Sequence, residues 1–301
     1  MSESPSPPPR LQGPVLVAVD GSEHAVRAAY AAADLAARTG VALHVVHVVR
    51  EPVEEWGTPI ETLLAFRERR GTRLLRDHVD ELHHEGFAVE EAHLCSGSAV
   101  DEVLALADRL DASLVVVGSG GAHHPALGST SEGLVHHAHR PVLVVRGDSD
   151  WPPQRVVVGD DTSQSACHAA LLAATVARAC GSRLLVLHGL PDLADLLDDG
   201  GGVDETRVAE LLHGAESGLE ERARELAPPL GVRPGVRVVV DQPAAALLDT
   251  AGEAGGPALV AVGSRGLSAM QRLRLGSVST QVLRGAAGPV LVVPPPADRS
   301  S

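Results

Sequence analysis

Short apolar runs alternate with longer amphipathic segments along the chain, and the whole alternation occurs twice. The first run covers residues 15–19, and Ala and Leu then recur at helical spacing over residues 25–36. Residues 156–158 and 166–180 repeat this strand and helix pattern in the second half of the chain. We therefore interpret the chain as an internal repeat of one strand–helix unit.

The other elements of the two copies follow in the same order. In the first copy the pattern predicts strands at residues 41–49, 88–94, 114–117 and 142–145, and helices at 63–82 and 100–110. In the second copy it predicts strands at 183–188, 236–240, 259–262 and 290–293, and helices at 208–226 and 244–251. A last helix precedes the fifth strand in each copy.

Local signals mark the ends of several of these helices. Gly40 and Gly181 follow the first helix of each copy, where a helix C-terminus favours glycine. Ser98 and Asp101 have the spacing of a capping box for the helix that follows.

Alternation of strands and helices predicts an α/β fold with a parallel sheet in each copy. The strands are near-continuous Val and Leu runs, which is the pattern of a sheet buried on both faces. The prediction is two tandem Rossmann-like domains, residues 12–146 and 154–294. Each is a five-stranded parallel sheet with helices on both faces, and a short polar linker joins them.

Composition narrows the classes of function. The net charge of −14 disfavours nucleic acid as a partner, because an acidic surface repels phosphate backbones. All 25 basic residues are arginine, which excludes a Walker A lysine and Schiff-base chemistry.

Cysteine usage and hydropathy suggest a cytoplasmic protein. The three cysteines have no disulfide or metal-knuckle spacing, so we expect reduced thiols. No apolar run approaches the roughly 18 residues of a membrane span, and residues 1–9 lack the apolar segment of a signal peptide.

A glycine loop in the second copy has the chemistry of a phosphate site. Gly263-Ser264-Arg265-Gly266 ends the fourth strand, and Gly276-Ser277-Val278-Ser279 opens the last helix nine residues later. Glycines allow a close backbone approach to an anion, and the helix start offers free N–H groups and a positive dipole end. Ser277 and Ser279 add hydroxyl donors, and Arg265 adds charge.

An ordinary structural explanation of the same residues stays open. Glycines after strands are common turn residues, and a serine at the start of a helix is a common cap.

The repeated unit resembles the universal stress protein family. The resemblance is carried by residues 19–22, 263–266 and 275–279 and by Pro-Val-Leu-Val-Val at 141–145 and 289–293. It covers nearly the whole chain, twice, and it implies the adenine nucleotide alpha hydrolase-like form of the fold. It also implies ATP as the ligand, with the triphosphate on the glycine loop and adenosine between the first and second strand ends.

Carried onto this sequence, the resemblance assigns a set of nucleotide contacts to the second copy. Asp161 at the first strand is the expected partner of a ribose hydroxyl, an amino group or a Mg²⁺ ion on the phosphates. The full set is Gly159, Asp161, Gly189, Gly263, Arg265, Gly266, Gly276, Ser277, Val278 and Ser279.

The first copy departs from the family pattern in its loop, which is three residues shorter and has Gly120 in place of Arg265. Nucleotide binding is therefore expected more strongly in the second copy. The candidate contacts in the first copy are Asp20, Val48, Gly118, Gly121, Gly128 and Ser129.

The 15 histidines do not predict a metal site, and no catalytic residue is assigned. His136 and His139 are three apart on a predicted helix but lack a third ligand. His44 and His47 are three apart in a strand and should face opposite ways.

The function expected from the sequence is that of an ATP-binding regulator or stress sensor with an unidentified protein partner. The alternatives are an enzyme that hydrolyses ATP or transfers its adenylyl group, and a ligand-free interaction module. As the resemblance implies, Val142–Val145 and Val290–Val293 should pair across a pseudo-twofold axis. This would give an intramolecular pseudo-dimer, and a homodimer of the whole chain stays open.

Overall fold

A computed structural model describes residues 11–50, 60–119, 127–146, 151–190, 205–253, 258–264 and 275–295. The chain divides into two compact units, of which the first comprises Leu11–Asp148 and the second contains the described residues from 151 onwards. Within the part of the chain that is described, no helix combines the length and the apolar character needed to cross a bilayer.

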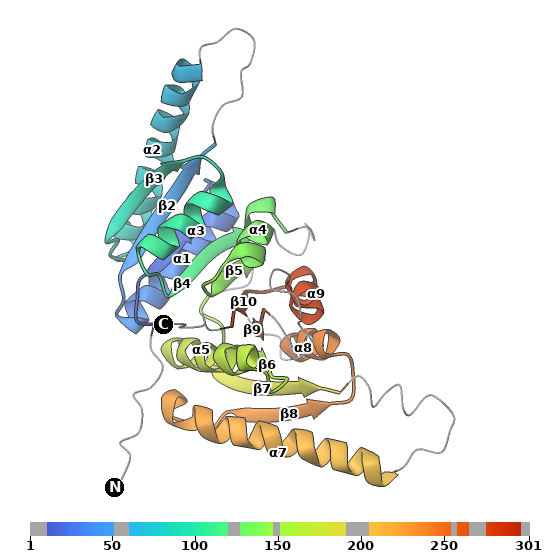
Figure 1. Ribbon diagram of the computed structural model, residues 1–301. Coiled ribbons are helices and arrows are strands. Elements are labelled where there is room, and N and C mark those ends of the chain that lie inside the picture. Colours follow the sequence, from blue (N-terminus) through green and yellow to red (C-terminus); the bar gives the residue numbers. More distant parts are fainter. Residues whose placement is uncertain are drawn as a thin grey trace, which may run out of the picture. The chain divides into compact units, whose positions relative to one another are not determined.

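The first unit is a five-stranded parallel sheet with the strand order β3-β2-β1-β4-β5 (Figure 1). Its elements are β1 (Val15–Ala18), α1 (Glu23–Thr39), β2 (Leu43–Val49), α2 (Ile60–His84), β3 (Glu91–Ser96), α3 (Ala99–Arg109), β4 (Leu114–Ser119), α4 (Ser129–His137) and β5 (Val142–Arg146).

The second unit repeats this topology, with the order β10-β9-β6-β7-β8 and parallel pairing throughout. Its elements are β6 (Arg155–Gly159), α5 (Gln164–Cys180), β7 (Arg183–Gly189), α7 (Glu205–Leu230), β8 (Gly235–Val239), α8 (Pro243–Gly252), β9 (Ala258–Gly263), α9 (Ser277–Gly285) and β10 (Val290–Val293). The predicted fold class is confirmed.

Strand register aligns the two units residue by residue. Val15 pairs with Leu43 and Leu114, and Val156 pairs with Leu184 and Leu259 at the equivalent places. This alignment makes it possible to compare what each unit carries at the same position of the sheet.

The cores consist of small aliphatic side chains, as the low aromatic content requires. The central strands are fully buried, and α1 and α5 each turn a row of alanines toward them. Ala at these positions lets a helix lie close to the sheet without a cavity.

The glycine signals predicted for two helix ends are confirmed. Gly40 and Gly181 end α1 and α5 in the left-handed conformation, with φ of 73° and 69°. The capping box at Ser98 was wrong in one respect: Ser98 is the N-cap of α3, but its side chain accepts no capping hydrogen bond. The predicted pairing of Val142–Val145 with Val290–Val293 stays a prediction.

Candidate functional site

A pocket of about 470 Å³ opens at the carboxyl ends of β1, β2 and β4 in the first unit. Open parallel α/β sheets bind their ligands at this edge. Five residues predicted from the sequence line the pocket, namely Asp20, Val48, Gly118, Gly128 and Ser129. A more open hollow of about 690 Å³ adjoins it and shares Arg50, Ala99, Ser129 and Thr130.

The floor of the pocket depends on a close approach between β4 and α1. A Cβ added at Gly118 would lie 2.3 Å from the backbone oxygen of His24. The carbonyl oxygen of Gly118 in turn accepts a hydrogen bond from the Ser131 hydroxyl at 2.9 Å. Gly118 therefore sets the distance between β4 and two helices, α1 and α4, that border the pocket.

Helix starts at this edge differ in how their first amides are satisfied. The Ser22 hydroxyl accepts from the Ala25 amide and closes the start of α1. The N-cap of α4 is Gly128, and among the described residues no side chain caps this helix. Ser129, Thr130 and Ser131 of this first turn line the pocket, so the positive end of the helix lies at its edge and favours an anion there.

Asp20 holds the turn before α1 at the rim of the pocket. It is exposed, and its Oδ1 accepts from the Ser22 amide at 3.0 Å. Its second carboxylate oxygen is available to a hydroxyl, an amine or a metal-bound water. Asp161 holds the Ser163 amide in the same way in the second unit.

Sequence reasoning missed Arg50 and His24 as pocket residues. Arg50 directly follows β2 and lines both hollows, and His24 lies in the first turn of α1. An arginine placed just after a strand's carboxyl end is a signal that the sequence does contain, because that edge collects the ligand-binding groups.

The second unit places its predicted residues in matching positions. Gly276 is the N-cap of α9, and Ser277 and Val278 form the first turn without a side-chain cap among the described residues. The Ser279 hydroxyl donates to the Gly263 carbonyl at 2.7 Å and is buried, so its proton is already used within the loop. Gly121, Arg265 and Gly266 lie outside the described residues.

Close packing against α8 explains why two other predicted positions of the second unit are glycine. A Cβ at Gly159 would lie 3.0 Å from Cδ1 of Leu247, and one at Gly189 would lie 2.7 Å from the Cα of Pro243. Leu247 and Pro243 occupy the α8 positions that Val103 and Ala99 hold in α3. The two glycines stand where the first unit has Ala18 and Val48, and they leave room for the larger Leu247 and Pro243 beside β6 and β7.

His44 and His47 face opposite sides of β2, as predicted. The Nδ1 atom of His44 lies 3.0 Å from Nε2 of His93, whereas Nδ1 of His47 lies 2.7 Å from the Val19 carbonyl oxygen. His188 makes the contact equivalent to that of His47, with the Asp160 carbonyl oxygen. On α2, burial lowers the pKa of His78, and this effect outweighs the carboxylates of Glu81 and Asp20, which raise it.

Comparison with known proteins gives one consistent result. The model of the universal stress protein family matches residues 13–146 and again residues 153–294. A universal stress protein of Mycobacterium tuberculosis is 33% identical over 300 residues, which cover 94% of this chain and 98% of that protein. A universal stress protein of Mycolicibacterium smegmatis is 31% identical over 298 residues, covering 93% and 97%.

A solved structure supports the fold. The crystal structure of a universal stress protein from Archaeoglobus fulgidus superimposes with a TM-score of 0.65 and covers 95% of this chain and 98% of that one. Its sequence identity of 22% makes it a match of fold.

Proposed function

The chain belongs to the universal stress protein family, and on this premise we propose that it binds ATP and acts as a nucleotide-controlled regulator. The pocket of the first unit is the observation that carries the proposal. It lies at the ligand-binding edge of a parallel sheet and brings together five residues that the family resemblance had assigned to nucleotide.

Each part of the pocket suits one part of an adenine nucleotide. Val46, Val48 and Val103 offer an apolar wall for the base. Asp20 is placed to accept from a ribose hydroxyl or to hold a phosphate-bound Mg²⁺ ion through water.

The phosphates would lie against the start of α4. Ser129 and Thr130 offer backbone donors there, since the Gly128 amide already donates to the Ser119 hydroxyl, and Arg50 supplies a cation that also lines the hollow. No lysine is required for this arrangement, in keeping with a chain whose basic residues are all arginine.

The second unit keeps the loop pattern of a phosphate site, but different side chains border the equivalent strand ends. Leu247 and Pro243 take the place of Val103 and Ala99, as described above. Gly159 and Gly189 in turn stand where the first unit has Ala18 and Val48. We propose an adenosine site in the first unit, where the described residues line a pocket, and a phosphate site in the second unit.

A substitution at Gly128 tests the proposal. Gly128 has φ of −61°, and a Cβ there would meet only the Ser131 hydroxyl at 3.7 Å, so an aspartate fits and is a favoured N-cap residue. Its carboxylate would accept from the first amides of α4 and would repel phosphate by about 4 kcal/mol at about 4 Å. Gly128→Asp should weaken ATP binding about tenfold or more without loss of folding.

Isothermal titration with ATP gives the readout, and Gly214→Asp is the matched control. Gly214 lies on α7 with open space around it, so this variant adds the same charge far from the loop in sequence. Equal ATP affinities in Gly128→Asp and Gly214→Asp, or no binding of ATP at millimolar concentration by the wild type, would refute the proposal.

Timed product analysis separates a regulator from an ATP-consuming enzyme. A regulator should turn over ATP well below about 1 per second, the low end of ordinary enzymes. His24 and Asp20, which both line the pocket, are the residues to substitute if a faster rate is found.

A further inference from the structure

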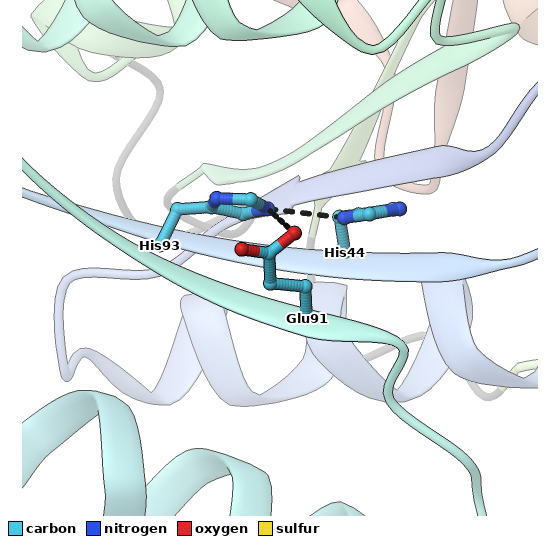
Figure 2. Close-up of side chains that lie close together, drawn as sticks. All are labelled: His44, Glu91 and His93. Carbon is cyan, nitrogen blue, oxygen red and sulfur yellow. Dashed lines mark hydrogen bonds and ion pairs between the residues drawn. The ribbon is translucent and has the colours of Figure 1, made fainter.

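Two neighbouring strands of the first unit bring three metal-ligating side chains together. Figure 2 shows His44 of β2 with Glu91 and His93 of β3 on one face of the sheet. The register pairs His44 with Glu91, and His93 lies two residues further along the same face. Strand pairing, and not a flexible loop, therefore sets the spacing of the three groups.

The distances between the ligand atoms are short. Nδ1 of His44 and Nε2 of His93 are 3.0 Å apart, and Nε2 of His93 lies 3.8 Å from Oε2 of Glu91. All three ligand atoms lie within 4.8 Å of one another. Ligands about 2.0–2.2 Å from a tetrahedral Zn²⁺ ion are roughly 3.3–3.5 Å apart, so small rotamer adjustments suffice.

We propose that His44, Glu91 and His93 bind a divalent transition-metal ion of the Zn²⁺ class. Two imidazoles and one carboxylate are the protein ligands of an open zinc site, in which water or another ligand takes the fourth position. The same donor set is also compatible with Ni²⁺ and Cu²⁺, because imidazole is a good ligand for each of them.

The three side chains of the cluster range from buried to exposed, so an ion could reach the site from solvent. His44 is 7% exposed and is held by the surrounding sheet. The His93 side chain is 15% exposed, and that of Glu91 is 63% exposed. An ion would approach from the Glu91 side and displace the contact between the two rings.

The second unit shows that the fold does not need these residues. The equivalent positions hold Leu185, Gly235 and Arg237, of which Arg237 forms an ion pair with Glu253 at 2.8 Å. In the first unit the α3 position of Glu253 is Arg109, which acts electrostatically on His93. Arg109 opposes a bound cation, and Glu91 is the group that offsets it.

The cluster is separate from the nucleotide pocket. None of the three side chains lines the pocket, and the nearest pocket residue of β2 is Val46, two residues beyond His44 and about 7 Å along the strand. The metal proposal therefore does not rest on the proposed function.

Zn²⁺ binding by the full chain tests the inference. The probe is the metal ion alone, titrated against a chromophoric chelator to obtain the number and affinity of sites. Glu91→Gln removes an exposed ligand oxygen at little structural cost, and His93→Arg copies the residue of the second unit. Each should weaken binding at one site at least tenfold, since even indirect partners of a metal contribute about 10–100-fold.

The other histidines require a control, because the chain has 15 of them. The double variant His136→Gln/His139→Gln removes the pair at the end of α4 and should leave the affinity of this site unchanged. Circular dichroism checks that each variant is folded.

Three results would overturn the proposal. They are no Zn²⁺ binding by the wild type, unchanged Zn²⁺ affinity in folded Glu91→Gln, and loss of the site only in the His136/His139 variant. A tetrahedral Co²⁺ absorption spectrum in the wild type that disappears in Glu91→Gln or His93→Arg would support it.

Discussion

At the scale of single residues, a buried ion pair distinguishes the second unit from the first. Nε of Arg222 lies 2.6 Å from Oδ2 of Asp160, whose side chain is 1% exposed. The equivalent residues in the first unit are Val19 and His78, as the shared strand and helix register shows. Burial alone would lower the pKa of Arg222, but Asp160, Cys167 and Glu225 together raise it, so the guanidinium stays charged.

Removal of the arginine should destabilise the second unit strongly. Arg222→Leu leaves the Asp160 carboxylate buried without its cation, which costs about 3–5 kcal/mol of unfolding free energy. The double variant Asp160→Val/Arg222→His copies the first unit and should recover most of that loss. Urea denaturation measures both, and a loss below about 0.5 kcal/mol in Arg222→Leu would show that the pair is unimportant.

The sequence could predict some site residues and not others. Asp20, Gly128 and Ser129 follow from strand ends and helix starts, which short-range patterns mark well. The cluster of His44, Glu91 and His93 could not be predicted, because His44 lies 47 and 49 positions from the other two and meets them only through strand register. The Asp160–Arg222 pair depends in the same way on a helix far along the chain.

At the scale of elements, the boundaries of buried strands were predicted more accurately than those of exposed strands and helices. The central strands were predicted within one or two residues because their Val and Leu runs are buried on both faces. The edge strand β3 is partly exposed and carries mixed residues, so its predicted range of 88–94 starts three residues before the observed Glu91–Ser96. The two long helices extend three or four residues past most of their predicted ends. The C-terminal extension of α7 includes Pro228 and Pro229, which ordinarily indicate that a helix has ended.

Two glycines that border the pocket, Gly118 of β4 and Gly128 at the start of α4, should differ sharply in how well they tolerate substitution. Gly118→Ala places a methyl group 2.3 Å from the His24 carbonyl oxygen and must push α1 away from β4. We expect a loss of about 1–3 kcal/mol or more from this overpacking. Gly128→Ala, with open space and an ordinary φ of −61°, should change stability by about 0.5 kcal/mol or less.

Thermal unfolding of the two alanine variants compares these costs directly. If Gly118→Ala were as stable as Gly128→Ala, the close packing of β4 against α1 would not be the reason for a glycine at position 118.

At the scale of the whole molecule, one duplicated scaffold carries two different sets of polar groups. The first unit has the described pocket and the histidine cluster, and the second has the longer glycine loop and the buried ion pair. The α/β plan of both units followed from hydrophobic pattern alone. The differences between their polar groups could not be predicted in this way, because they depend on which side chains fill the space beside equivalent strands.

Hydrogen exchange of the full chain with and without ATP tests the central claim most directly. Bound phosphate should slow exchange at the uncapped first amides of α4, Ser129 and Thr130. The Ala25 amide, which Ser22 already holds, should change little. Unchanged exchange at Ser129 and Thr130 in millimolar ATP would contradict a nucleotide site at this edge of the first unit.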